Sequence, residues 1–327
     1  MSDSVGWGIL ATGGIARLFT NDLVAHGHRV AAVGSRSAAS AEAFASEFAV
    51  PRAHATYEDL VADPDVDVVY VATPHSFHAD NAALALHAGK HVVIEKAFTI
   101  NAAQARTVAE LGADRGLLVM EAMWTRFLPH MRQVRAWLAD GRIGAIRSLH
   151  ATHLQRLPFD DAHRLNNPAL GGGALLDLGV YPISFAHDLL GPVEAVHAEA
   201  TFKPTGVDET VATILRHTGG GVSTSYSSMS VLGPNRATVI GTEGLIEIDP
   251  TWYGPARATL YDADSHELEV FDEPVTGRGM QYQAAEAEAM LAQGATSSPL
   301  MTPTASVEVM ATLEAVRDRI GLRYPEE

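Results

Sequence analysis

The sequence predicts an α/β domain with a doubly wound parallel sheet, followed by an α+β domain with a large, open and mostly antiparallel sheet. In the first 121 residues, short apolar segments alternate with helix-like segments. Strands that are apolar on both faces belong to a parallel sheet covered by helices on both sides. From residue 122 onward, short strand-like segments follow one another and are joined by Gly, Pro and Asp, which indicates an antiparallel or mixed sheet.

The first domain, residues 1–121, contains five expected strands and four expected helices. Right-handed crossovers between such strands produce a doubly wound sheet. Asn101 is a helix cap and Gly89 a helix stop. The apolar strand segments are 5–11, 29–35, 66–72, 91–95 and 117–121, and the helical segments are 14–26, 38–48, 76–88 and 101–115.

The second domain, residues 122–327, begins with a helix over 129–139 and closes with helices over 280–293 and 304–321. We expect the C-terminal helix to be able to pack back on the first domain. Eight short segments between these helices have strand patterns: 146–155, 193–202, 211–216, 222–229, 237–240, 245–248, 259–262 and 268–271.

Charge and cysteine content exclude several classes of function. With 23 basic and 39 acidic residues the net charge is −16, so we expect no nucleic-acid partner and no anionic membrane surface. The chain has no Cys, which excludes disulfides, thiolate metal sites and a Cys nucleophile. The first residues show no signal-peptide pattern and no stretch approaches the ~20 apolar residues of a membrane helix. We therefore expect a cytoplasmic protein.

A glycine-containing turn follows the first strand and opens the first helix. It matches the dinucleotide fingerprint GxGxxG/A, except that Ala11 replaces the first glycine; alanine is tolerated there if its φ is negative. Glycine lets the backbone approach a pyrophosphate, and the helix N-terminus donates amide hydrogens to it. The alternative is a turn that binds nothing. The expected cofactor contacts are Thr12, Gly13, Gly14, Ile15 and Ala16.

The residues that follow the second strand indicate which dinucleotide the domain binds. An NAD site usually places an acidic residue here, but no acid occurs between Val33 and Ala41. Ser35 and Arg36 occupy the position instead, and a guanidinium pairs with a 2′-phosphate. We predict NADP as the cofactor, with NAD as the alternative; a solvated surface arginine is the other interpretation.

Two further segments carry residues suited to catalysis. Lys96 lies at the end of an apolar strand, where a lysine is costly unless it has a role or a partner such as Glu95. Asp177 and Tyr181 are four residues apart, so a helix would place them on one face, although Pro182 suggests a helix break or start nearby. A capped helix with a core tyrosine is the alternative.

These motifs together resemble the Gfo/Idh/MocA oxidoreductases from end to end. The similar segments are WGILATGGIA, TPHSFH, AGKHVVIEKAF, MEAMWTRFLP, GGGALLDLGVYPISF, TGVDETV, GTEGLIEIDP and GRGMQYQAAE. Three of them, EAMWTRFLP, TGVDETV and GMQYQAAE, are typical of the branch of dimeric dihydrodiol dehydrogenases and NADP-dependent D-xylose 1-dehydrogenases. The resemblance implies a Rossmann domain followed by an α+β domain.

The resemblance also implies residue roles. Lys96 matches the lysine of the family's EKP motif, whose proline is Ala97 here, and Asp177 and Tyr181 match its Asp-x-x-x-His/Tyr pair. A tyrosine with a reference pKa near ~10 is a better base beside a lysine, which stabilises the phenolate. We thus expect Lys96, Tyr181 and Asp177 to be catalytic. The further expected cofactor contacts are Thr73, Pro74, His75, His78, Glu95, Lys96, Trp124, Arg126 and Tyr282.

Two histidine pairs, His75 with His78 and His150 with His153, raise the question of a metal. The second pair is predicted on a strand, where residues three apart point to opposite faces, and the first lies beside the expected cofactor. We therefore predict no metal site.

The predicted function is hydride transfer between NAD(P) and a hydroxyl carbon of a sugar, polyol or cyclic diol. The alternatives are a cofactor-binding sensor without turnover and an oxidoreductase that retains its cofactor. We expect a homo-oligomer, a dimer or larger, because the second sheet offers a broad face.

Overall fold

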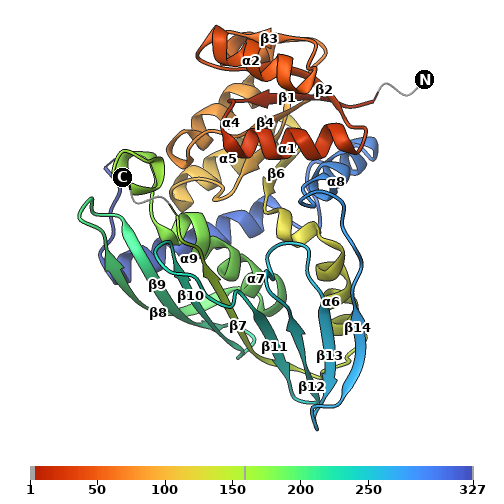
Figure 1. Cartoon of the computed structure of the whole chain (residues 1–327), viewed down its shortest axis with the longest axis vertical. Coiled ribbons are helices and arrows are strands. Elements are labelled where there is room, and N and C mark those ends of the chain that lie inside the picture. Colours follow the sequence, from red (N-terminus) through yellow and green to blue (C-terminus); the bar gives the residue numbers. More distant parts are fainter. Residues whose placement is uncertain (1–3, 158–159, 326–327) are drawn as a thin grey trace. The chain divides into compact units, whose positions relative to one another are not determined.

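The computed structural model describes residues 4–157 and 160–325 of the chain (Figure 1). Contacts between Cα atoms divide it into two compact units. Unit 1 comprises residues 1–124 and 276–307, and unit 2 comprises residues 125–275 and 308–327. The sequence-based division placed all residues after 121 in the second domain; here the segment 276–307 clusters with the first unit instead.

Unit 1 contains a six-stranded sheet with the order β3-β2-β1-β4-β5-β6, in which every neighbouring pair is parallel. The order reverses between β1 and β4, the place where such folds bind dinucleotides. The strands are β1 (Gly6–Leu10), β2 (Arg29–Gly34), β3 (Ala53–His54), β4 (Val68–Val71), β5 (His91–Glu95) and β6 (Val119–Ala122).

Helices alternate with these strands, as the sequence pattern predicts. The short strand β3 and the helix α3 after it have no counterpart in the sequence prediction. The helices are α1 (Gly14–Ala25), α2 (Ala38–Phe48), α3 (Tyr57–Ala62), the 3₁₀ turn η1 (His75–Phe77), α4 (His78–His87) and α5 (Ala102–Arg115), and the returning segment adds α8 (Gln281–Ala292).

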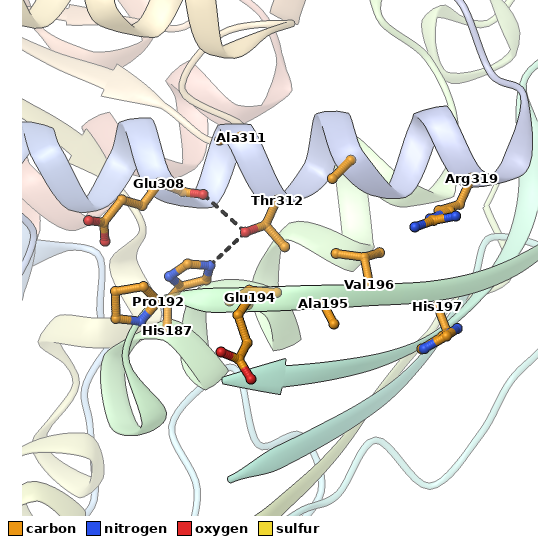
Figure 2. Close-up of a pocket in the computed structure, with 12 residues that line it drawn as sticks. His187, Pro192, Glu194, Ala195, Val196, His197, Glu308, Ala311, Thr312 and Arg319 are labelled. Atoms are coloured by element: carbon orange, nitrogen blue, oxygen red, sulfur yellow. Dashed lines mark hydrogen bonds between the residues drawn. The ribbon is translucent and has the colours of Figure 1, made fainter. Parts of the chain in front are cut away.

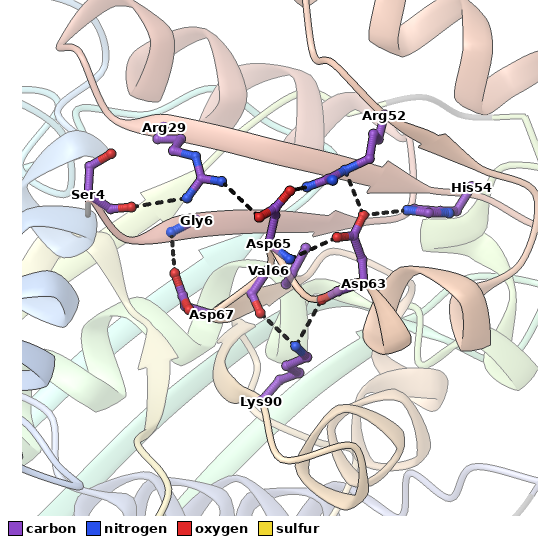
Figure 3. Close-up of polar contacts among 10 residues, drawn as sticks. All are labelled: Ser4, Gly6, Arg29, Arg52, His54, Asp63, Asp65, Val66, Asp67 and Lys90. Carbon is purple, nitrogen blue, oxygen red and sulfur yellow. Dashed lines mark hydrogen bonds and ion pairs between the residues drawn. The ribbon is translucent and has the colours of Figure 1, made fainter.

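The loop that leads into β4 is fixed by polar contacts (Figure 3). The Asp63 carboxylate forms an ion pair with the Arg52 guanidinium at 2.8 Å and lies within hydrogen-bond distance, 2.8 Å, of His54 Nε2. Lys90 donates to the carbonyl oxygens of Asp63 (2.9 Å) and Val66 (2.7 Å). Burial raises the pKa of Asp63, but the hydrogen bonds from the Asp65 N–H and His54 and the charge of Arg52 outweigh it, so that the pKa is lowered. The network lies at the amino ends of the strands, opposite the ligand-binding edge.

Unit 2 contains an eight-stranded sheet with the order β14-β13-β12-β11-β7-β10-β9-β8 (Figure 1). Only β7 and β10 pair in parallel among these described strands; the other neighbours are antiparallel. The strands are β7 (Ile146–Leu154), β8 (Val193–Phe202), β9 (Asp208–His217), β10 (Val222–Ser228), β11 (Ala237–Gly241), β12 (Gly244–Ile248), β13 (Ala258–Asp262) and β14 (Glu267–Phe271).

Helices cover one face of this sheet. The π-helix η5 continues directly into α7, which packs on β7 and β10. Two helical elements, η2 (Trp124–Phe127) and α9 (Pro303–Ile320), have residues in both units. The helical elements that lie wholly in unit 2 are α6 (Pro129–Ala139), η3 (Arg164–Asn166), η4 (Pro168–Leu170), η5 (Leu175–Gly179) and α7 (Val180–Leu190). The predicted α/β and α+β organisation is confirmed.

One segment of unit 2, Pro168–Leu190, is long and apolar enough to pass a test for a membrane span. By length and composition, the expectation that no stretch approaches a membrane helix is wrong for this segment. Within the protein, 89% of its most apolar window is buried, as is typical of the central helix of a globular domain.

Candidate active site

The predicted phosphate loop lies between β1 and α1. Gly13 is the N-cap of α1, and within the described chain no side chain caps this helix. A Cβ atom added to Gly13 or Gly14 would meet no described atom within 4 Å, so the backbone N–H groups are open to a ligand. Ala16 is fully buried and lets α1 pack closely on the sheet. Open amides at the start of a helix suit a pyrophosphate, so Thr12, Gly13, Gly14 and Ile15 could hold one.

Ala11 differs from the expectation. Its φ is 87°, not negative, because the turn keeps the backbone that the missing glycine would adopt. The Ala11 N–H donates to the Gly34 carbonyl oxygen (3.0 Å), which ties the turn to the end of β2. Alanine at positive φ costs about 1 kcal/mol or more.

Ser35 and Arg36 follow β2 at the same edge of the sheet. The Ser35 N–H donates to the His54 carbonyl oxygen (3.1 Å). The Arg36 guanidinium lies 6.0 Å from the Phe77 ring centre. Burial raises the pKa of Tyr57, and the Arg36 charge and hydrogen bond oppose that shift. An exposed guanidinium held between aromatic side chains can pair with a 2′-phosphate and stack on an adenine.

The TPHSFH segment follows β4. His75 and His78 are buried, and their rings meet edge to face at 5.6 Å. His78 Nδ1 lies 2.9 Å from the Ala97 carbonyl oxygen and Nε2 lies 2.8 Å from the Thr73 carbonyl oxygen. His78 therefore ties the loop after β4, with Thr73 and Pro74, to the loop after β5. This backbone role is what its contacts show; direct cofactor contact stays a prediction.

Glu95 and Lys96 lie at the carboxyl end of β5. The buried Glu95 carboxylate accepts a hydrogen bond from the Tyr70 hydroxyl. Lys96 is half-buried, and the peptide bond from Lys96 to Ala97 is cis. Because the strands of unit 1 are parallel, Lys96 lies at the same sheet edge as the phosphate loop.

Trp124 and Tyr282 are the remaining site residues expected in unit 1. The Arg278 guanidinium lies 5.8 Å from the Trp124 ring centre. The buried Asp22 carboxylate of α1 accepts from the backbone N–H groups of Arg278 (3.1 Å) and Met280 (3.0 Å). Asp22 thereby anchors the start of α8, which carries Tyr282. No local sequence pattern indicates this contact, because it joins residues more than 250 positions apart.

In unit 2, Asp177 and Tyr181 lie on one continuous helical segment, η5 followed by α7. The Arg164 guanidinium lies 3.3 Å from the Asp177 carboxylate. α7 begins at Val180, two residues before Pro182, which agrees with the helix start expected near this proline, and the helical segment continues through it without a break. The wider π turn of η5 precedes it, and a π-bulge accommodates a residue that lacks an N–H. Such bulges are frequent at functional sites.

An aromatic cluster that the sequence analysis missed surrounds Tyr181. Its ring meets His153 of β7 edge to face at 4.7 Å, and His153 stacks on Tyr253 at 3.7 Å. The Gln155 amide nitrogen lies 2.8 Å from His153 Nε2 and 3.2 Å from the Tyr253 hydroxyl. Residues from β7 and from the loop after β12 thus form the surroundings of the predicted base.

Arg126 is buried against α7. Its Nε donates to the Ser184 hydroxyl (3.0 Å), its Nη2 donates to the Ser184 carbonyl oxygen (2.7 Å), and Nη1 lies 3.7 Å from the Asp188 carboxylate. These contacts fix α7, and a cofactor contact for Arg126 stays a prediction.

The histidine pairs do not form a metal site in the part of the chain that the structure describes, where no cluster of three His, Cys, Asp or Glu could hold an ion. His150 is exposed and His153 is buried, so they point to opposite faces of β7 as predicted.

A groove of about 550 Å³ lies between β8 and α9 in unit 2 (Figure 2). On the wall of this groove, His187 Nε2 and the Thr312 hydroxyl form a hydrogen bond at 2.9 Å. Burial, together with the charges of Arg126 and His217, lowers the pKa of His187 to about 3. None of the predicted site residues is among the described residues that line this groove.

Comparison with known proteins decides the family. Residues 5–123 match the oxidoreductase family with an NAD-binding Rossmann fold, and residues 131–247 match the GFO/IDH/MocA C-terminal domain. The chain belongs to the Gfo/Idh/MocA family of oxidoreductases. The family identification and the expectation of an NAD(P)-dependent oxidoreductase are thus confirmed.

Two curated relatives cover nearly the whole chain. The trans-1,2-dihydrobenzene-1,2-diol dehydrogenase of Mus musculus is 36% identical over 98% of this chain and 98% of its own. The D-xylose 1-dehydrogenase (NADP(+)) of Hypocrea jecorina is 35% identical over 98% of this chain and 93% of its own.

Solved structures show the same fold. A 3-ketoreductase from Actinomadura kijaniata in complex with NADP and TDP-benzene has a TM-score of 0.85 and 29% identity, covering 97% of this chain and 98% of that one. The aldose-aldose oxidoreductase from Caulobacter crescentus, complexed with glycerol, has a TM-score of 0.87 and 26% identity, covering 97% of both chains.

Proposed function

We propose that the protein is an NADP-dependent dehydrogenase that acts on a hydroxyl carbon of a sugar, a polyol or a cyclic diol. One observation carries this proposal. Asp177 and Tyr181 lie on a single helical segment beside the His153 and Tyr253 rings, in a chain that matches sugar and diol dehydrogenases over almost its full length.

The residues of unit 1 fit the cofactor. The open amides at Gly13 and Gly14 would hold the pyrophosphate, and Arg36 would pair with the 2′-phosphate. NADP, when bound, supplies the hydride acceptor or donor. The structures and names of relatives that include NADP support this choice over NAD.

Tyr181 is the proposed acid–base. When an alcohol is oxidised, the hydroxyl proton must leave as the hydride leaves the carbon, and the Tyr181 oxygen takes that proton. An ammonium group stabilises a phenolate, which is the role we assign to Lys96. Asp177 would orient the substrate hydroxyls. A positioned acid–base contributes about 10²- to 10⁴-fold to the rate.

A panel assay tests the proposal. The absorbance of reduced nicotinamide is followed while aldoses, inositols, other polyols and trans-dihydrodiols are added with NADP or NAD. We expect turnover of at least one class, with preference for NADP. Cofactor binding without turnover of any compound would favour a sensor. Cofactor that stays bound through gel filtration would favour an enzyme that retains it.

A homo-oligomer stays a prediction. Ile214 of β9 and Tyr226 of β10 are exposed on the sheet, which leaves apolar side chains available for contact between copies. Sedimentation equilibrium tests this: a monomer mass at micromolar concentration would contradict it.

A further inference from the structure

The helical segment that carries Asp177 and Tyr181 lacks a local cap. Ala174 is the N-cap residue of η5, and no side chain of a neighbouring described residue accepts a hydrogen bond from the first turn there. The first N–H groups of a helix have no partner within the helix and need an acceptor elsewhere. Since this segment is buried, water does not readily supply that acceptor.

Asp208, from the TGVDETV segment, supplies the acceptor. It lies at the start of β9, 33 positions further along the chain, and is fully buried. Its Oδ2 accepts a hydrogen bond from the Leu175 N–H at 2.6 Å. The Ala174 N–H also stabilises the ionised form of the Asp208 carboxyl group and so acts to lower its pKa. The carboxylate therefore caps the first turn of η5, where negative charge is favourable.

Gly173 makes this approach feasible. A Cβ added to Gly173 would lie 2.0 Å from Asp208 Oδ1, and its φ of 120° is one that L side chains rarely adopt. Only glycine leaves room for a carboxylate against this turn. The glycine turn and the acid are thus two parts of one arrangement.

The C-terminal segment of unit 2 completes the arrangement. The buried Arg317 of α9 favours the charged form of Asp208 and lies 5.0 Å from the Tyr324 ring centre. The Tyr324 hydroxyl donates to the Gly172 carbonyl oxygen at 2.8 Å. Burial nevertheless raises the pKa of Asp208 to about 7, although Leu175, Arg317 and Ala174 oppose the shift.

The capped turn is directly linked to the proposed catalytic residues. The Asp177 N–H donates to the Gly173 carbonyl oxygen (3.3 Å), and Tyr181 follows one turn later. A displacement of this turn moves both side chains, and a 1 Å misplacement of a catalytic group can cost ~10²-fold in rate.

We propose that Asp208 is a positioning residue: its carboxylate holds the first turn of the helix that carries Asp177 and Tyr181. The catalytic part of this inference rests on the proposed function. The structural part does not, because it concerns how firmly this turn is held.

The test uses the full-length protein and the variant Asp208→Asn, which keeps the volume and removes the charge. Hydrogen–deuterium exchange of the peptide that covers residues 174–181 is compared with steady-state kinetics. We expect exchange in this peptide to be at least tenfold faster and kcat to fall ~10- to 100-fold. The KM for NADP should stay within twofold, because the phosphate loop, Ser35 and Arg36 belong to unit 1.

Ile246→Val, in the core of β12, is the matched control for lost stability. It should lower the melting temperature while leaving kcat and exchange at 174–181 within twofold of the wild type. If Asp208→Asn does not fold, the wild type is measured at pH 6 and pH 8. Protonation of Asp208 should then weaken protection of 174–181 at pH 6, after correction for the intrinsic exchange rate.

Unchanged protection at 174–181 in Asp208→Asn, or in the wild type between the two pH values, would overturn the proposal. A kcat within twofold of the wild type despite faster exchange would overturn the catalytic part. Failure of the proposed function itself is distinguishable, since then the wild type would turn over no panel substrate while the exchange result would stand.

Discussion

We predict that the choice between NADP and NAD depends on one side chain, Arg36. The guanidinium is exposed after the end of β2, 6.0 Å from the Phe77 ring centre, where a 2′-phosphate could accept a charge-assisted hydrogen bond from it. Hydrogen bonds to charged groups contribute about 1.5–3 kcal/mol. Arg36→Ala should therefore raise the KM for NADP by about 10- to 150-fold.

NAD has no 2′-phosphate, so it loses only the stacking of the guanidinium on adenine. A cation–π contact of this kind contributes about 0.5–1 kcal/mol at an exposed site, which predicts a rise of about two- to fivefold in the KM for NAD. The assay is initial-rate kinetics with both cofactors at saturating substrate. Arg29→Ala is the matched control, because Arg29 begins the same strand at the opposite edge of the sheet. Equal losses with both cofactors in Arg36→Ala would refute the reasoning.

Three further predictions concern stability and metal. The pKa of Asp63 is lowered in the folded protein, so its contribution is present above the unfolded pKa and is lost as the pH falls through the folded pKa. Asp63→Asn should cost about 1–3 kcal/mol at pH 7 by urea unfolding, and this difference should shrink in acid; a pH-independent difference would contradict it. Ala11→Gly should not lower the free energy of unfolding, since glycine adopts positive φ freely. Ala103→Gly in α5, in contrast, should lower it by about 1 kcal/mol. Similar losses of unfolding free energy in both variants would contradict the strain at Ala11. Prolonged chelation should leave activity unchanged, and a loss restored by a divalent ion would show a metal requirement.

The fold was predictable because its signals are local. Strands such as Val68–Val71 are apolar on both faces, and the helices between them have caps and stops that can be read from a few residues. The strand β3 was missed because two residues cannot show a pattern. The segment 276–307 was assigned to the second domain because nothing in its sequence shows that Asp22 binds its backbone.

Sequence reasoning could propose site residues only where a motif lies in one continuous segment. Lys96, Asp177 and Tyr181 belong to such segments. His153, Tyr253 and Asp208 do not, since strand pairing and a long loop bring them to Tyr181 or to its helix. The π turn before Pro182 was not predicted, because it depends on packing that the sequence pattern does not show.

Replacement of Tyr181 by Phe tests the central claim most directly. The change keeps the ring that meets His153 and removes only the hydroxyl. We predict that kcat falls by ~10²-fold or more while the affinity for NADPH, measured by fluorescence titration, barely changes. Tyr261→Phe, on β13, is the matched control and should keep full activity. Lys96→Met should also lower kcat, and the double variant should be no worse than the poorer single one, because both changes disable one proton-transfer unit. Nearly full activity in Tyr181→Phe would show that Tyr181 is not the acid–base.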